Sequence, residues 1–122
     1  MADSLNQLNK LMERGCAFLG TRYAIMGGAM CWVSERSLVS AISNAGGFGV
    51  IACGSMSPEL LDQELKATKA LTNKPFGVNL ITMHPALAEL IEVCVRHEIA
   101  HVVLAGGLPP RLAIERLKEA GI

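Results

Sequence analysis

The sequence predicts an α/β fold built on a parallel sheet. Four short apolar runs recur about 25 residues apart, a spacing that suits repeated strand-plus-helix units. Stretches with helical periodicity separate these runs, and parallel neighbouring strands need such crossover helices. The runs are continuously apolar rather than alternating, which is typical of strands that are buried on both faces. A doubly wound sheet and a (β/α) barrel both satisfy these observations.

Each expected element has its own local signal. We expect strands at the four apolar runs, 23–26, 48–52, 76–81 and 101–105, and a short lead helix at 5–15 over one end of the sheet. Ser34 is placed to cap the first crossover helix, and Gly46 follows that helix at a position that favours a positive φ. Ser57, followed by a proline, begins the second helix. Pro85 and Pro110 open the third and the fourth.

The bulk composition narrows the class of protein. The 122 residues suffice for one domain, and 11 acidic residues balance 11 basic ones. Without a basic stripe we expect no nucleic-acid partner, and the apolar runs are too short for a membrane helix. The four cysteines show no CxxC spacing, and no charged and apolar export leader is visible. We therefore expect free thiols, no metal site and a cytoplasmic protein.

Glycines cluster at both ends of the expected strands. Gly46, Gly47 and Gly121 follow helices, where glycine serves tight turns. The glycines that follow strands are Gly27, Gly28, Gly54, Gly106 and Gly107. They lie at the carboxyl end of the sheet, where parallel α/β folds bind ligands, and they indicate a flat or phosphate-bearing ligand. The GxGxxG and GK[ST] motifs are absent, which argues against the Rossmann and Walker nucleotide sites.

A resemblance to a known family runs through residues 22–122. It is carried by IMGGAMCWVSERSLVSAISNAGGFGVIACG, by LTNKPFGVNLI and by HVVLAGG. These segments resemble the nitronate monooxygenase family, formerly called 2-nitropropane dioxygenases, which includes FMN-dependent enoyl-ACP reductases. The resemblance implies an FMN-binding TIM barrel, in agreement with the alternation of strands and helices.

The resemblance also implies which residues approach FMN. They are Gly28, Ala29 and Met30 after the first strand, Asn79 near the end of the third, and Gly106 and Gly107 after the fourth. Two positions depart from the family pattern. Gly27 stands where the family usually has glutamine, and Leu108 stands where a further glycine is common.

The sequence assigns no catalytic residue within the chain. A TIM barrel takes about 250 residues and eight strands. We therefore expect residues 1–122 to be the N-terminal half of one FMN-binding TIM-barrel domain, with the family's catalytic histidine beyond residue 122. We expect His84 to be a polar group at a helix start and His97 to suit a helix end. We expect His101 to begin a strand at the end opposite the ligand.

Three other side chains near the expected ligand end are interpreted as structural. Trp32 is expected to anchor the start of the first crossover helix by packing. Cys31 and Cys53 are expected to be small buried hydrophobic groups rather than nucleophiles, because no His–Asp pair accompanies them in the sequence.

The resemblance implies FMN-dependent oxidation of alkyl nitronates by molecular oxygen, with the 122-residue chain inactive by itself. An FMN-dependent enoyl-ACP reductase acting on an enoyl thioester is the alternative. A third hypothesis is a non-enzymatic half-barrel that self-associates. An open half-barrel has two free strand edges and an apolar inner face, and both features favour partners. We therefore expect a small-molecule substrate and a homo-oligomer.

Overall fold

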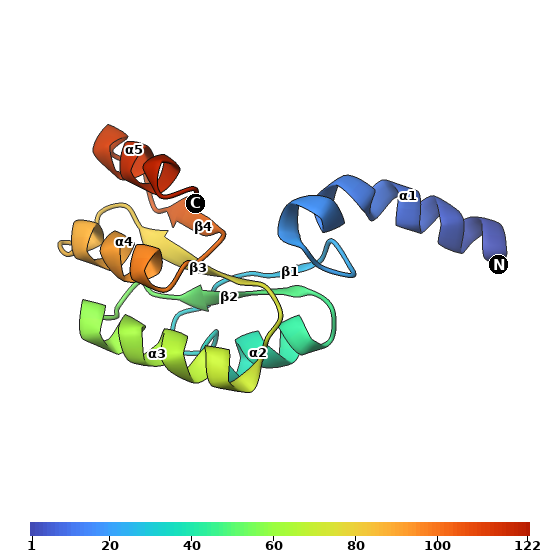
Figure 1. The fold of residues 1–122 in the computed structure, drawn as a ribbon, viewed down its shortest axis with the longest axis horizontal. Helices are drawn as coiled ribbons and strands as arrows, with labels where there is room; N and C mark the ends of the chain where they lie inside the picture. Colours follow the sequence, from blue (N-terminus) through green and yellow to red (C-terminus); the bar gives the residue numbers. More distant parts are fainter.

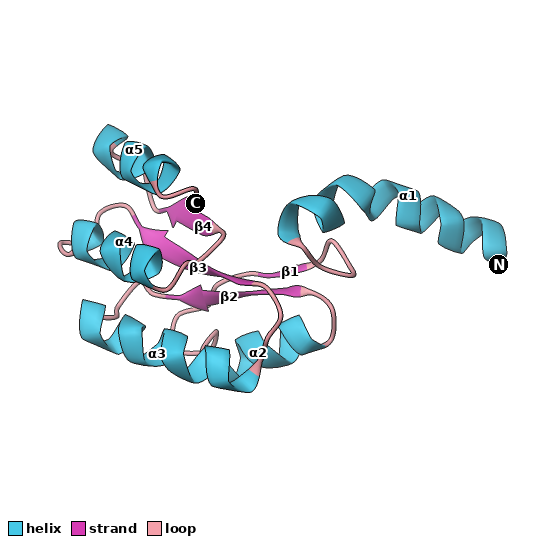
Figure 2. Ribbon diagram, viewed as in Figure 1, coloured by secondary structure: helices cyan, strands magenta, loops and turns pink.

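A computed structural model describes residues 1–122, except for the side chain of Ala2. The elements follow in the order α1 (Ala2–Leu19), β1 (Met26–Gly27), α2 (Arg36–Asn44), β2 (Phe48–Ala52), α3 (Pro58–Leu71), β3 (Phe76–Ile81), α4 (Leu87–Arg96), β4 (Val102–Ala105) and α5 (Arg111–Glu119). The four strands form one parallel sheet in the order β1-β2-β3-β4. The predicted α/β fold with four parallel βα units is thus confirmed (Figure 2).

Helices α2 to α5 wrap one face of the curved sheet, each beside the next (Figure 1). The main core lies between them and that convex face, and it includes Ile51, Val78 and Leu80 from the strands and Leu61, Leu65 and Leu90 from the helices. Burial of these side chains supplies most of the driving force for folding. No described helix is both long and apolar enough to cross a membrane.

The opposite, concave face of the sheet has no helical layer among the described residues. The prediction that the strands are buried on both faces is confirmed for β2, whose residues are all buried, and is wrong for the outer strands β1 and β4. Phe48 and Val50 point to the concave side and are buried there with Leu19 of α1. On the outer strands, Met26 stays 48% exposed and Val103 37% exposed. The outer strands thus carry apolar side chains that the described residues do not bury.

Helix α1 is longer than the predicted helix at 5–15, and only its last turn meets the sheet. It ends at Gly20, whose φ of 69° is left-handed. Nε2–H of His101 donates to the carbonyl oxygen of Phe18 at 2.8 Å, and the two rings meet edge to face at 4.8 Å. The first half of α1 reaches away from the sheet (Figure 1). The lead therefore covers one end of the sheet only through its carboxyl-terminal turn.

Strand β1 is shorter than predicted. The expected strand at 23–26 contracts to Met26–Gly27, so Gly27 lies in the strand rather than after it. Upstream, Tyr23 donates its N–H to the carbonyl of Gly46 at 2.9 Å, and Phe48 donates to that of Ile25 at 2.9 Å. The chain therefore stays alongside β2 without forming a regular ladder. Similarly, β4 begins at Val102 and not at residue 101.

Helix starts differ from the sequence prediction at three places. Glu35, and not Ser34, caps α2, because its carboxylate accepts from the N–H groups of Ser37 and Leu38. Pro85 lies in the turn before α4, which begins at Leu87. Pro110 is the residue before α5 rather than its first residue. In each case the turn between the strand and the helix is one or two residues longer than the sequence predicted.

Other predicted caps are confirmed. The hydroxyl of Ser57 accepts from the N–H of Leu60 at 3.3 Å, with Pro58 as the first helical residue of α3. Gly46 after α2 has a φ of 95°, and Gly121 after α5 has a φ of 75°. Both are left-handed values that glycine adopts without a steric penalty.

Helix α2 lies so close to β2 that only glycine fits at position 49. A Cβ there would lie 2.5 Å from the carbonyl oxygen of Val39 and 2.9 Å from its Cα. Because these are backbone atoms of a helix, they cannot move without displacing α2. Gly49 therefore sets the distance between the first crossover helix and the sheet.

We expect Gly49→Ala to lower the free energy of unfolding by about 1–3 kcal/mol, the usual cost of overpacking a core. Urea denaturation followed by circular dichroism measures this change. Gly28→Ala is the control, because a Cβ at Gly28 meets no described atom within 4 Å, and a surface change of this kind stays within about 0.5 kcal/mol. Equal stability of the two variants would contradict the close packing of α2 on β2.

An ion-pair network joins α3 to the end of α4. The carboxylate of Asp62 accepts from Nζ of Lys66 at 2.5 Å and from Nε2 of His97 at 2.7 Å, while Arg96 lies 4.0 Å away. Lys69 also donates to the carbonyl of His97 at 2.5 Å. The bonds from Lys66 and His97 lower the pKa of Asp62 from 3.8 to about 2.

This shift predicts how stability depends on pH. A carboxyl group whose pKa is depressed in the folded state stabilises the fold above its unfolded pKa, and it loses that contribution as the pH falls. We expect Asp62→Asn to lower Tm at pH 7, and we expect the difference from the wild type to shrink between about pH 4 and pH 2. Thermal melts across this range measure it, with Glu13→Gln on the exposed face of α1 as the control. A difference in Tm that stays constant down to pH 2 would contradict the role of the ionised carboxylate.

Candidate functional site

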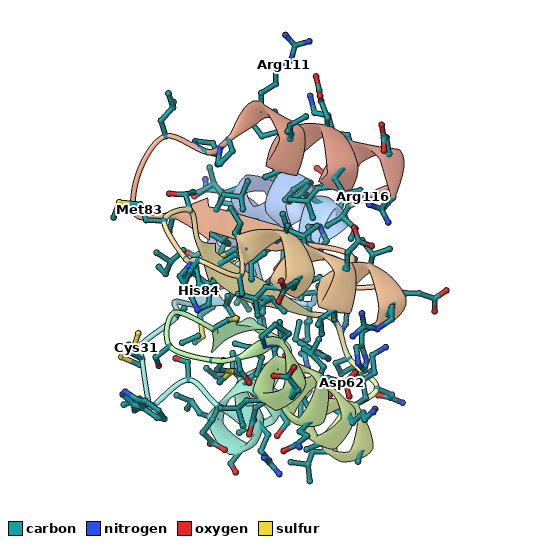
Figure 3. All side chains as sticks on the ribbon, turned by 90° about the vertical axis from the view of Figure 1, so that its left-hand side faces the viewer. Cys31, Asp62, Met83, His84, Arg111 and Arg116 are labelled. Carbon is teal, nitrogen blue, oxygen red and sulfur yellow. The ribbon has the colours of Figure 1, made fainter. Side chains whose placement is uncertain are left out.

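The candidate site lies at the carboxyl ends of the strands, where the four βα loops meet. Cys31, His84 and Met83 belong to the loops after β1 and β3, and they lie along the same side of the molecule (Figure 3). Ile81 on the concave face joins two further loops. A Cβ at Gly54 would lie 3.1 Å from Cγ1 of Ile81, and one at Gly106 would lie 3.2 Å from its Cγ2. The loops after β2 and β4 therefore both pack on this side chain.

The loop after β1 is held by Ser34. Its hydroxyl accepts from the N–H of Met30 at 2.9 Å and donates to the carbonyl of Gly28 at 3.1 Å. Its own carbonyl accepts from the N–H of Ala52 at 3.0 Å, which ties the loop to β2. The serine that the sequence suggested as a helix cap thus shapes the ligand-end loop instead. Because its polar atoms are paired, Ser34 can be buried here at no cost in hydrogen bonds.

The same loop exposes two large side chains. Met30 is 53% exposed, as expected for a residue that approaches a ligand. Trp32 is 78% exposed and has a left-handed φ of 63°. The prediction that Trp32 is a packing anchor is therefore wrong: the turn from Met30 to Ser34 directs the indole outward instead of into the core. A bulky residue with such a φ carries backbone strain.

Asn79 lies on the concave face of β3, between Ala52 of β2 and Val103 of β4 in the sheet register. Its carbonyl accepts from the N–H of Cys53 at 3.2 Å, which fixes the backbone. The side-chain carboxamide is half-buried and makes no hydrogen bond to another described residue. It is a free donor and acceptor on an otherwise apolar surface.

The turn after β4 brings unpaired backbone close to β3. Gly106 has a φ of 87° and Gly107 a φ of 157°. The N–H groups of Gly28, Gly106 and Gly107 donate to no other residue that the structure describes. A Cβ at Gly107 would lie 3.3 Å from the hydroxyl oxygen of Thr82, so the glycine keeps the backbone against that side chain.

Thr82 is a candidate that the sequence reasoning missed. It is 8% exposed, and its hydroxyl has no hydrogen-bond partner among the described residues. A buried hydroxyl without a partner costs about 1–3 kcal/mol, so it is a natural contact for a ligand group. The available signal was a polar residue directly after the apolar strand 76–81, at the ligand end.

The histidines have structural partners. Nδ1 of His84 accepts from the N–H of Ala86 at 3.1 Å, which confirms its role as a polar group near a helix start. His97 ends α4, and His101 precedes β4 at the opposite end of the sheet. Burial raises the pKa of the Cys53 thiol to about 12, so this side chain is a hydrophobic filler and not a nucleophile. Cys31 is exposed, in contrast to the prediction that it is buried, because the loop after β1 faces outward.

A comparison with protein families decides the identity of the fold. Residues 13–106 match the family model described as nitronate monooxygenase. The match covers more than half of the chain. The chain belongs to the nitronate monooxygenase family. Members of this family are FMN-dependent oxidoreductases with a TIM-barrel fold.

Two kinds of curated relative match the chain. A (3aS,4S,5R,7aS)-5-hydroxy-7a-methyl-1-oxo-octahydro-1H-indene-4-carboxyl-CoA dehydrogenase from Mycobacterium tuberculosis is 36% identical over 84% of this chain and 29% of the relative. A probable nitronate monooxygenase from Staphylococcus saprophyticus is 38% identical over 58% of this chain and 20% of the relative. The chain therefore spans less than a third of the length of these relatives.

Solved structures of family members superpose on the four βα units. FabK from Thermotoga maritima matches with a TM-score of 0.84 and 35% identity, over 88% of this chain and 34% of FabK. A nitroalkane oxidase from Streptomyces ansochromogenes matches with a TM-score of 0.77 and 25% identity, over 88% and 40% of the two chains. The four units thus correspond to about a third of a TIM-barrel enzyme.

The residues of this nitronate monooxygenase family chain fit a flavin ring. An unpaired carboxamide at Asn79 and free N–H groups at Gly106 and Gly107 can bind ring heteroatoms, while Ile81 offers an apolar surface. Gly28 leaves space for close approach. The assignment of Gly28, Ala29, Met30, Asn79, Gly106 and Gly107 to FMN stays a prediction, and Ala29 already packs partly against Leu19, Phe48 and Val50.

The unpartnered hydroxyl of Thr82 gives a test that needs no cofactor. Thr82→Val keeps the shape of the side chain and removes the buried polar atom, so we expect the 122-residue chain to become more stable by about 1 kcal/mol. Urea denaturation measures the change, and Thr68→Val is the control, because its hydroxyl donates to the carbonyl of Glu64 at 2.7 Å. The control should lose stability, and a loss of stability in Thr82→Val would show that the hydroxyl has a partner.

Proposed function

We propose that the chain provides the first four βα units of an FMN-dependent oxidoreductase. The proposal is carried by the free carboxamide of Asn79 on the concave face, beside backbone N–H groups that no described residue uses. Family membership supports it, because the matched enzymes place these units in a larger barrel. FMN bound there would accept electrons from one substrate and pass them to another.

The chain's own residues would position and shield the cofactor. The Asn79 carboxamide would orient the ring by hydrogen bonding, and the N–H groups of Gly106 and Gly107 would bind an edge of it. The Thr82 hydroxyl would pair with a polar group that reaches the turn after β4. Met30 would cover part of the ring and exclude water. None of these residues is a base, so proton transfer would require another group.

Alkyl nitronate oxidation by molecular oxygen is our first candidate for the reaction. It is supported by the family model and by relatives named nitronate monooxygenase from several bacteria. A small nitronate would need few protein contacts beyond the flavin ring itself. The concave face around Asn79 and Ile81 spans β2 to β4 and would carry the flavin.

Oxidation or reduction of an acyl thioester is a second candidate, favoured by two observations. At similar coverage, 84% and 85% of this chain, the CoA dehydrogenase relatives are 36% and 33% identical, whereas a probable nitronate monooxygenase from Staphylococcus aureus that covers 85% is 24% identical. The ligand-end loops also expose large apolar side chains at Met30, Trp32, Met83 and Leu108. Such a surface suits a bulky acyl group better than a small nitronate.

A chimera tests the proposed cofactor. Residues 1–122 would be joined to the remaining part of the Thermotoga maritima FabK barrel, which the four units match in structure. We expect the chimera to be purified with FMN, and we expect Asn79→Ala to weaken FMN binding about tenfold, because it removes one or two hydrogen bonds. Flavin absorbance and fluorescence titration measure this, with Gln63→Ala on the exposed face of α3 as the control.

The same chimera separates the two reactions. Nitronate-dependent oxygen uptake and NAD(P)H-dependent reduction of crotonyl-CoA would be measured side by side, with intact FabK as the reference. A gain in the first relative to FabK supports nitronate oxidation, and a gain in the second supports thioester chemistry. A folded chimera that takes up no FMN would overturn the proposed function.

A further inference from the structure

The loops at the carboxyl ends of the strands are almost free of charge. They comprise residues 28–35, 53–57, 82–86 and 106–110, between each strand and the helix that follows it. The only Asp, Glu, Lys or Arg in these four loops is Glu35, and its carboxylate is engaged in capping α2. We therefore expect the part of a ligand that contacts these loops to be uncharged, because a buried ionic group needs a partner of opposite charge.

The same loops are apolar as well as uncharged. Trp32 and Val33 in the loop after β1, Met83 in the loop after β3 and Leu108 in the loop after β4 are each at least half exposed. Three of the four loops thus present large apolar side chains at the same end of the sheet. A surface of this composition binds hydrocarbon groups rather than polar ones.

Trp32 differs from the other three in the strain of its backbone. Its φ of 63° is left-handed, a region that a bulky residue enters only at an energetic cost. Hydrogen bonds inside the loop impose this conformation. The N–H groups of Val33 and Ser34 donate to the carbonyl of Met30 at 3.1 and 2.8 Å, and the N–H of Met30 donates to the Ser34 hydroxyl at 2.9 Å. The outward direction of the indole is therefore a property of the loop itself.

The loop holds this side chain at the rim of the candidate site. A Cβ at Gly54 would lie 3.3 Å from Sγ of Cys31 and 3.1 Å from Cγ1 of Ile81, so Cys31 reaches the centre of the ligand end. Cys31 lies along the same side of the molecule as Met83 (Figure 3). Trp32 follows Cys31 directly in the chain. An indole held there adjoins the surface on which FMN is predicted to bind.

Packing does not compensate for the strain at Trp32. The side chain is 78% exposed, so it buries little apolar surface within the fold. Glycine would adopt the same φ without a steric penalty. A strained residue that stabilises nothing around it is typical of positions that contact a ligand.

We propose that Trp32 determines substrate specificity, with its indole packing against the acyl group of a thioester substrate. An indole offers hydrocarbon a large and rigid apolar face. The inference rests on the proposed function, and within it on the second candidate reaction, because it names the part of the substrate that the ligand-end loops recognise. Trp32 contacts the acyl chain and takes no part in electron transfer.

Binding of saturated acyl-CoA to the FMN-loaded chimera tests this contact without turnover. Isothermal titration calorimetry measures Kd for dodecanoyl-CoA and for acetyl-CoA. We expect Trp32→Ala to raise Kd for dodecanoyl-CoA about tenfold and Kd for acetyl-CoA less than about twofold, because only the longer chain reaches the rim. Leu112→Ala on α5 is the matched control, since Leu112 is also 78% exposed, and it should change neither value. Trp32→Phe should recover most of the lost affinity.

The outcomes separate the inference from the proposed function. If the chimera binds FMN and Trp32→Ala leaves Kd for dodecanoyl-CoA unchanged, the inference is overturned and the flavin site stands. A folded chimera without FMN overturns the proposed function and the inference with it. Free dodecanoate should bind at least about tenfold more weakly than dodecanoyl-CoA, because these loops provide no cation for its carboxylate. Equal affinity would overturn the assignment to a thioester.

A measurement on the 122-residue chain tests the inference without the chimera. Trp32→Gly removes the indole and relieves the left-handed φ, so we expect Tm to rise by about 2–5 °C. Thermal denaturation followed by circular dichroism measures the change. Val33→Gly in the same loop is the control, because Val33 has no positive φ, and it should lower Tm. A fall in Tm for Trp32→Gly would show that the indole stabilises the fold, and the inference would fail.

Discussion

The pairing of β2 with β3 is the constraint on which the rest of the structure depends. Its register sets Val50 opposite Gly77 and Ala52 opposite Asn79. Because side chains alternate along a strand, this register decides which residues face the helices and which face the concave side. Ile51, Val78 and Leu80 enter the main core, and Asn79 is left on the open face. A shift by one residue would bury the carboxamide under the helices and expose the core.

The packing of the helices on the convex face follows from that register. Gly49 lets α2 rest directly on the sheet, and Glu64 of α3 accepts from the backbone N–H of Arg36 at 3.2 Å, at the start of α2. The guanidinium of Arg36 bonds the same carboxylate. Neighbouring helices are thus fixed to each other as well as to the strands, which makes the loops at the carboxyl ends of the strands a rigid frame for binding.

Parts of this arrangement could be read from the sequence and parts could not. Strands β2 and β3 have the predicted bounds, because their apolar runs are long and are bounded by glycine or proline. Strand β1 is shorter than predicted because, at the edge of the sheet, it pairs with only one neighbouring strand. Among the candidate site residues, Asn79 and the glycines after β4 do lie at the ligand end, whereas their contact with FMN rests on the family resemblance. Trp32 and Thr82 were misjudged or missed, since exposure and hydrogen-bond satisfaction are set by tertiary contacts and not by local pattern.

The bond between His101 and Phe18 has a consequence for the order of folding. It joins groups that are 83 residues apart in the sequence, and with the packing of Leu19 it ties α1 to the sheet. Closing so long a loop is entropically unfavourable until the intervening strands are in place. During synthesis α1 emerges first, and Leu19 can pack on Phe48 and Val50 once β2 has formed, but the bond to His101 must wait until β4 has left the ribosome. The first element of the chain to be made therefore receives its last tie to the sheet from the fourth strand.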